Sequence, residues 1–155
     1  MCGADAIASV AGAPRAPAGA PRVTADVLAT LPARLSDHQA AFSRTGGLHA
    51  AGLFAPDGTV LAVREDVGRH NALDKVVGWA LREGRLPLTG VLACVSGRLS
   101  FELVQKAARA GLPLLAGVSA PSSLAIALAR ERDITLCGFV RGGRLNVYAG
   151  AGRIA

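Results

Sequence analysis

Arginine and serine residues gather at three points where a predicted strand leads into a predicted helix. The segments are residues 65–71, 96–100 and 119–123, and the side chains that could bind an anion there are those of Arg69, Ser96, Arg98, Ser119 and Ser122. Ligands of open α/β sheets bind beyond the carboxyl ends of the strands, and the free N–H groups of helix N-termini favour anions. The pattern therefore predicts a pocket for a phosphate or a diphosphate.

A structural explanation for part of the same pattern stays open. Ser100, Ser122 and Asp66 are good helix N-caps, so capping alone accounts for their positions. Capping does not account for Arg69 and Arg98, which lie directly beside them.

The histidines do not predict a metal site. His70 opens a helix and His49 begins a strand, but a zinc ion needs further ligands at compatible spacing, and the sequence has no Cys-x-x-Cys motif.

The three cysteines differ in their surroundings. Cys94 and Cys137 lie within apolar runs and are predicted to be buried structural thiols. Cys2 lies between Met1 and Gly3, where an exposed thiol could carry a sulfur atom. An unreactive terminal thiol is the alternative for Cys2.

The elements that position these residues alternate between strands and helices. The runs 91–95 and 114–118 are apolar throughout, which is typical of parallel strands buried on both faces, so we expect both to be central. Apolar residues at helical spacing predict helices over 69–82, from 100 to 110 and from 122 to 132. Hairpins are predicted for 48–65 and 134–149. These elements predict an α/β fold with a mixed sheet that is parallel in its middle.

The N-terminal part is less regular. Residues 1–23 are rich in Ala, Gly and Pro and are interpreted as a flexible lead-in to one domain over 24–155. A helix is expected from Thr24, and Pro32 is expected to begin a second helical piece that runs to Arg44.

Composition narrows the class of protein. The chain has 155 residues and a net charge of +6, but its arginines are dispersed and aromatic residues make up only 4%. Single-stranded nucleic acid needs aromatic stacking platforms, so a nucleic-acid groove is not predicted. No apolar run approaches the roughly 18 residues of a membrane span. Three scattered cysteines favour a reducing cytoplasm.

Several motifs together strongly resemble the FdhD family of formate dehydrogenase accessory sulfurtransferases. The most specific is REDVGRHNALDK at 64–75, and the others lie at 44–51, 96–98, 101–106, 118–123 and 138–148. The resemblance, which runs from about residue 24 to the end, implies a three-layer, cytidine-deaminase-like fold. It also implies that persulfide sulfur passes from a cysteine desulfurase to the molybdenum or tungsten bis-guanine-dinucleotide cofactor of the formate dehydrogenase catalytic subunit.

The resemblance also implies site residues. The family's cofactor-binding segment matches Phe139, Val140, Arg141, Gly142, Gly143 and Arg144. We expect it to act with His49, Arg69, His70, Ser96, Arg98, Ser119 and Ser122, and we expect GDP to be a surrogate ligand. An ordinary hairpin turn with exposed arginines is the alternative for 139–144.

The front of the chain departs from the family pattern. Members of the family carry an additional N-terminal domain and a Cys-Gly-x-Cys-Gly loop, and Cys2-Gly3 matches only its second half. The expectation is a truncated or short form, either a sulfurtransferase with Cys2 as its catalytic thiol or a cofactor-binding chaperone without turnover. A zinc deaminase is remote, because His70-Asn71-Ala72 stands where deaminases have His-x-Glu. A homodimer is expected by analogy with the family.

Overall fold

The computed structural model describes residue 12 and residues 14–155. The helices are α2 (Ala25–Ser36), α3 (Ala40–Thr45), α4 (Arg69–Arg82), α5 (Phe101–Ala110), α6 (Ser123–Glu131) and the short 3-10 helix η1 (Ala151–Arg153). The strands are β1 (His49–Phe54), β2 (Val60–Asp66), β3 (Leu92–Val95), β4 (Leu114–Gly117), β5 (Thr135–Arg141) and β6 (Arg144–Ala149).

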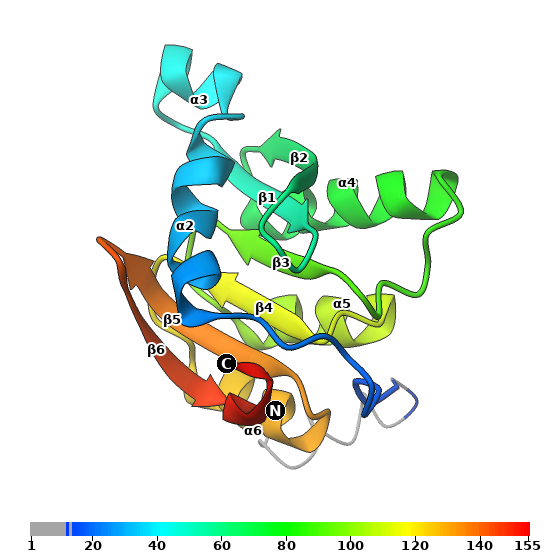
Figure 1. The fold of residues 1–155 in the computed structure, drawn as a ribbon. Coiled ribbons are helices and arrows are strands. Elements are labelled where there is room, and N and C mark those ends of the chain that lie inside the picture. The colour runs from blue at the N-terminus through cyan, green and yellow to red at the C-terminus, as the bar shows by residue number, and fades with distance from the viewer. Residues whose placement is uncertain (1–11, 13) are drawn as a thin grey trace.

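One mixed sheet with the order β2-β1-β3-β4-β5-β6 organises the fold (Figure 1). Strands β3, β4 and β5 run parallel, and the remaining neighbours pair antiparallel. The predicted fold class is confirmed. So is the prediction for the runs 91–95 and 114–118, because β3 and β4 are central, parallel and buried along their full length.

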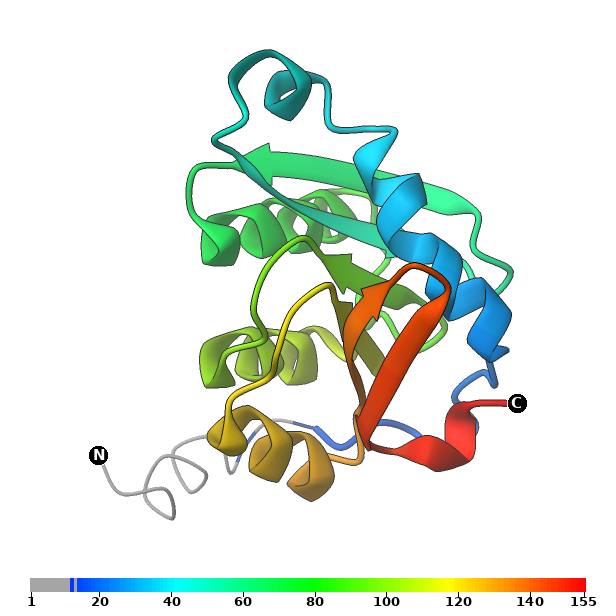
Figure 2. The same cartoon turned by 90° about the vertical axis from the view of Figure 1, so that its left-hand side faces the viewer.

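The chain forms three layers, with α4, α5 and α6 on one face of the sheet and α2 on the other (Figure 2). Successive residues of a strand point to opposite faces, so each strand supplies both cores. Ala93 and Val95 belong to the cluster under α4, α5 and α6, whereas Leu92 and Cys94 belong to the cluster under α2.

The N-terminal helices differ from the prediction. Pro32 lies inside α2 and does not begin a second helix, and α3 is a separate helix that starts at Ala40. Proline removes a helical N–H donor. However, Leu28, Leu31 and Leu35 are at most 1% exposed, and their burial on one face holds the helix together across Pro32.

The stretch before α2 contacts the rest of the chain. The N–H of Ala16 donates to the carbonyl oxygen of Arg132 at 2.9 Å, and Val23 pairs with Ile154. The domain boundary at residue 24 stays a prediction. No helix in the described part of the chain is long and apolar enough to cross a membrane.

The close approach of two loops gives a first test. A Cβ atom on Gly117 would lie 2.8 Å from Leu99 Cγ and 3.1 Å from the carbonyl oxygen of Gly97, whereas a Cβ on Gly78 in α4 would meet nothing within 4 Å. Gly117→Ala should therefore lower the free energy of unfolding by about 1–3 kcal/mol through overpacking. Gly78→Ala should raise it by about 0.5–1 kcal/mol through helix propensity. Urea unfolding measures both, and an unchanged Gly117→Ala stability would contradict this packing.

Candidate functional site

The loop between β2 and α4 is organised by the carboxylate of Asp66. One oxygen lies 2.7 Å from Lys75 Nζ, and the other accepts the N–H of Gly68 at 2.9 Å and the amide of Asn71 at 3.3 Å. The hydrogen bond from Lys75, followed by that from Gly68, lowers the pKa of Asp66 to about 2. Asp66 is not the N-cap of α4 as the sequence suggested, because Gly68 occupies that position.

The loops after β3 and β4 are joined by backbone hydrogen bonds. The N–H of Leu99 donates to the carbonyl oxygen of Ala120 at 3.1 Å, and the N–H of Ser122 donates to that of Leu99 at 3.0 Å. Ser100 and Ser122 then cap α5 and α6 by accepting the N–H groups of Leu103 and Ala125, which confirms the capping prediction for both serines. Figure 2 shows the end of the sheet at which the parallel strands finish, and the two loops run side by side there.

A hollow of about 330 Å³ opens beside these caps, and we call it the arginine hollow. Its lining comprises Arg69, Arg98, Leu99, Ser100, Ala120, Pro121 and Ser122. The structure thus brings Arg69, Arg98 and Ser122 together, as the sequence predicts for a phosphate pocket. The Nε atom of Arg69 is buried and has no hydrogen-bond partner in the described part of the chain. A buried donor without a partner is costly, so this atom fits an anionic ligand.

His70 lies at the same edge of the sheet. Its Nε2 atom is 3.1 Å from Ser100 Oγ, the hydroxyl oxygen that caps α5. The described residues contain no group of three or more His, Cys, Asp or Glu side chains that could hold a metal ion.

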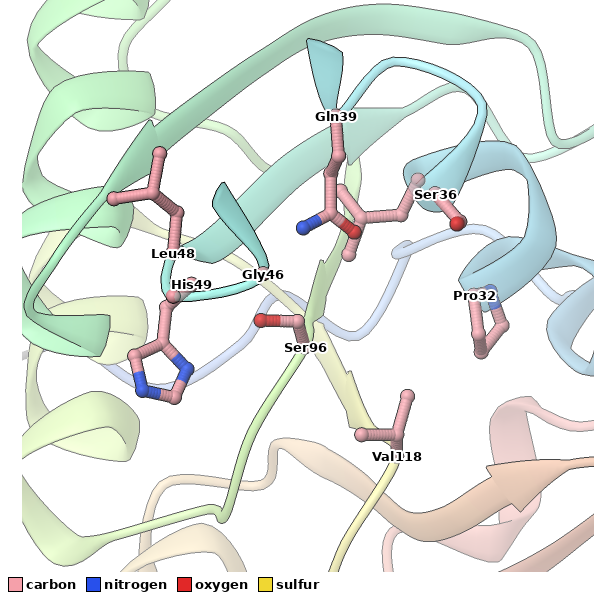
Figure 3. A pocket seen from close by; sticks show the side chains of 10 residues that line it. Pro32, Ser36, Gln39, Gly46, Leu48, His49, Ser96 and Val118 are labelled. Carbon is pink, nitrogen blue, oxygen red and sulfur yellow. The ribbon is translucent and has the colours of Figure 1, made fainter. Parts of the chain in front are cut away.

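A second pocket, of about 420 Å³, lies between the C-terminal end of α2 and the segment before β1, and we call it the α2 pocket (Figure 3). It is lined by Pro32, Leu35, Ser36, Gln39, Gly46, Gly47, Leu48, His49, Ser96 and Val118. The predicted residues His49 and Ser96 are therefore near each other but outside the arginine hollow. Sequence reasoning missed Gln39 because a single glutamine after a helix carries no local signal.

The β5–β6 hairpin forms a third hollow, of about 580 Å³, lined by Phe139, Arg141, Gly142, Arg144 and Asn146. Gly142 and Gly143 have φ values of 58° and 74°, a left-handed conformation that favours glycine. Phe139 also has a positive φ, of 51°, and its ring centroid lies 5.5 Å from Arg141 Cζ. A non-glycine residue in this region stores strain, which is typical of ligand-binding segments.

The hairpin hollow shares no lining residue with the arginine hollow or the α2 pocket. The connection runs through Ser119, whose carbonyl oxygen accepts the N–H of Phe139 at 3.2 Å. Val140 is fully buried in the cluster under α2, so its side chain belongs to the core. A ligand common to the hairpin and the strand ends stays a prediction.

Cys94 and Cys137 lie in the core, where their thiols do not reach solvent. Cys94 and Cys137 are both fully buried, as predicted, and burial raises the pKa of each to about 12. The predicted catalytic thiol, Cys2, lies outside the described residues.

The comparisons with known proteins agree on one family. The model of the FdhD/NarQ family matches residues 1–155. Sulfur carrier protein FdhD from Nocardia farcinica is 60% identical over 156 residues, which cover 99% of this chain and 56% of that protein. Sulfur carrier protein FdhD from Streptomyces coelicolor is 57% identical over 158 residues, which cover 100% of this chain and 56% of that protein. The chain thus spans just over half the length of these relatives.

A solved structure is also similar. It is the crystal structure of a protein from Desulfotalea psychrophila described as a formate dehydrogenase accessory protein, with a TM-score of 0.81 and 33% sequence identity. The match covers 92% of this chain and 60% of that one.

The lowered pKa of Asp66 gives a pH test. Its folded value of about 2 lies below the ordinary 3.8, so ionised Asp66 stabilises the fold fully above about pH 4, and this contribution is lost as the pH falls through 2. The thermal midpoint of the wild type should fall more between pH 4 and pH 2 than that of Asp66→Asn. Asp37→Asn, at an exposed position, is the control. Parallel pH curves for the wild type and Asp66→Asn would contradict the assignment.

Proposed function

The chain belongs to the FdhD/NarQ family, and on that premise we propose that it is the cofactor-binding part of a sulfur carrier for formate dehydrogenase maturation. Its cargo is the guanine-dinucleotide form of the molybdenum or tungsten cofactor. Its partners are a cysteine desulfurase, the catalytic subunit of formate dehydrogenase and a second copy of the chain, in the cytoplasm. The names of the similar proteins support the sulfur carrier role and the accessory role.

The observation that carries the proposal is the arginine hollow. Arg69 and Arg98 both line this hollow, and the buried Nε–H of Arg69 has no hydrogen-bond partner in the described chain. The hollow also lies at the N-termini of α5 and α6, where Ser100 and Ser122 stand as caps. Guanidinium groups and helix N-termini are suited to the same ligand, a phosphate group. In the proposed function, these residues bind a diphosphate of the cargo.

The hairpin hollow supplies the second contact in this proposal. Phe139 offers an aromatic face for a guanine ring, and Arg141 and Arg144 offer charge for its diphosphate. The left-handed turn at Gly142 and Gly143 leaves no side chain between the backbone and a ligand. The cargo carries two guanosine diphosphate ends, so more than one cationic hollow on the same chain fits its chemistry.

In this proposal Cys2 handles the sulfur, because Cys2-Gly3 resembles the second half of the family's persulfide loop. The sequence has three cysteines, and two of them are buried with a pKa of about 12. In the proposed step, the Cys2 thiolate attacks the outer sulfur of the desulfurase persulfide. A new S–S bond forms at Cys2, the old S–S bond breaks, and the desulfurase cysteine leaves as a thiolate. A cofactor-binding chaperone that uses the same hollows without turnover is the competing function.

Calorimetry with GDP tests the ligand. Arg98→Ala and Arg144→Ala should each weaken GDP binding by about 1.5–3 kcal/mol, the usual loss for a hydrogen bond to a charged group. Arg109→Ala, at an exposed position near the C-terminal end of α5, is the matched control and should leave the affinity unchanged. Unchanged affinity in both of the first two variants would remove the support for nucleotide binding at these hollows.

Thiol labelling separates the carrier from the chaperone. The thiolate is the reactive form of a cysteine, and burial raises the pKa of Cys94 and Cys137 to about 12, so both stay protonated at pH 8. Cys2 should therefore react with an alkylating reagent much faster than Cys94 and Cys137, which should label only after unfolding. After incubation with a desulfurase and cysteine, mass spectrometry should place the added sulfur on Cys2. Sulfur on Cys94 or Cys137 would refute the assignment, and no added sulfur would favour the chaperone.

A further inference from the structure

Strand β2 is an open edge of the sheet, because it pairs with β1 on one side only. Ala50 of β1 lies opposite Glu65 but directs its own N–H and C=O groups to Ser96. Residues of an antiparallel pair alternate in this respect, so the backbone groups of Glu65 and Val63 point to the open side. An edge of this kind can take up a strand of another protein.

A groove of about 570 Å³ lies between this edge and α4, which packs beside β2 (Figure 1), and we call it the edge groove. It is lined by Arg64, Glu65, Lys75, Gly78 and Arg82. Cations therefore outnumber carboxylates in its lining. The edge groove shares no lining residue with the arginine hollow, the α2 pocket or the hairpin hollow.

Two of these cations occupy backbone acceptors of the open edge. Lys75 donates to the carbonyl oxygen of Glu65 at 2.9 Å and also pairs with Asp66, and Arg64 donates to the carbonyl oxygen of Val63 at 2.8 Å. A hydrogen bond between a cation and a carboxylate is stronger than one between a cation and a neutral carbonyl. A carboxylate brought into the groove therefore competes for these cations and releases the carbonyl oxygens for a new strand.

Arg82 is the third cation, and it makes no hydrogen bond or ion pair within the described chain. Gly78 lies one turn before it on α4, and a Cβ atom there would meet nothing within 4 Å, so the groove is open at this point. Leu81, next to Arg82, is 65% exposed and adds apolar surface at the same end of the helix. The charge of the groove favours an acidic occupant over a neutral or basic one.

We propose that β2 is a docking edge for an extended, acidic segment of a partner protein. The segment adds to the sheet as a strand beside β2, with its carboxylates toward Arg64 and Arg82 and its N–H groups donating to the carbonyl oxygens of Val63 and Glu65. A strand without carboxylates leaves the cations on these acceptors, so the edge selects its partner by charge. The docking goes beyond the proposed function and does not depend on the cargo, because the edge groove is separate from the three hollows.

Fluorescence anisotropy with a labelled peptide in which Glu and Val alternate tests the groove. The wild type should bind this peptide, and more weakly at high salt. Arg82→Glu should weaken binding roughly tenfold, because attraction becomes repulsion. Gly78→Met places a side chain in the open groove and should weaken binding at least as much. Arg109→Glu, at an exposed position on α5 outside the groove, is the matched charge reversal and should bind like the wild type.

Amide hydrogen exchange, followed by NMR, separates strand pairing from attraction between charges alone. The peptide should slow the exchange of Val63 and Glu65, whose N–H groups point to the open side, and leave that of Arg64, which points to β1, unchanged. The same peptide with Gln in place of Glu should bind more weakly, and so should the peptide with N-methylated backbone amides.

Equal binding of the Glu and Gln peptides would overturn the selection by charge. Binding without slower exchange at Val63 and Glu65, binding that survives Gly78→Met, or no binding to the wild type would overturn the docking edge. Slow exchange at both amides before any peptide is added would mean that a second copy of the chain already covers β2, which also overturns the inference. These outcomes leave the GDP measurements untouched, so the proposed function stands or falls separately.

Discussion

The structure depends on the parallel pairing of β3 with β4, which continues beyond the ends of both strands. Leu99 pairs with Pro121 through backbone hydrogen bonds after the strands have ended, and its side chain is fully buried against Gly117. Because this contact uses backbone groups, it fixes where the next helices begin. Ser100 and Ser122 consequently cap α5 and α6 at neighbouring positions, and Arg98 is held at the mouth of the arginine hollow.

The net charge of +6 includes basic residues with two different roles. Arginines line the arginine hollow, whereas Lys75 and Arg64 bind backbone carbonyl groups at the edge of the sheet. Strand β2 is an edge of the sheet, and Ala50, which lies opposite Glu65, directs its own N–H and C=O toward Ser96. The N–H and C=O groups of Glu65 therefore point away from β1, toward the open edge of the sheet, and those of Val63, two residues earlier, do the same. Lys75 donates to the carbonyl oxygen of Glu65 at 2.9 Å and Arg64 to that of Val63 at 2.8 Å. These cations occupy acceptors that another strand would need, and they protect the edge from unwanted pairing.

The sequence predicted the parts of the structure that have local signals. The apolar runs at β3 and β4 and the serine caps of α5 and α6 follow from residue type and spacing, and each is confirmed. The predicted helix start at Pro32 was wrong, because burial of Leu31 and Leu35 against the sheet outweighs the loss of one helical hydrogen bond. The division of the predicted site into three hollows could not be read from the sequence either. It depends on the path of α2 across the sheet, which places Gln39, just after this helix, and Ser96 in the lining of one pocket, and no pattern within either segment encodes that arrangement.

The buried thiols of Cys94 and Cys137 line none of the three hollows. Cys94 and Cys137 lie on the α2 face of the sheet, where each pairs with Ala116 from opposite sides of β4, and both are buried in the same core. Placing a reactive thiolate there would require burying its charge, which the raised pKa of about 12 for each shows to be unfavourable. The sheet can therefore hold a ligand at its carboxyl edge without exposing a thiol of its own to it. In the proposed function, the sulfur that reaches the bound cargo therefore comes from neither Cys94 nor Cys137, and we assign this role to Cys2 on the resemblance of Cys2-Gly3 to the family's persulfide loop.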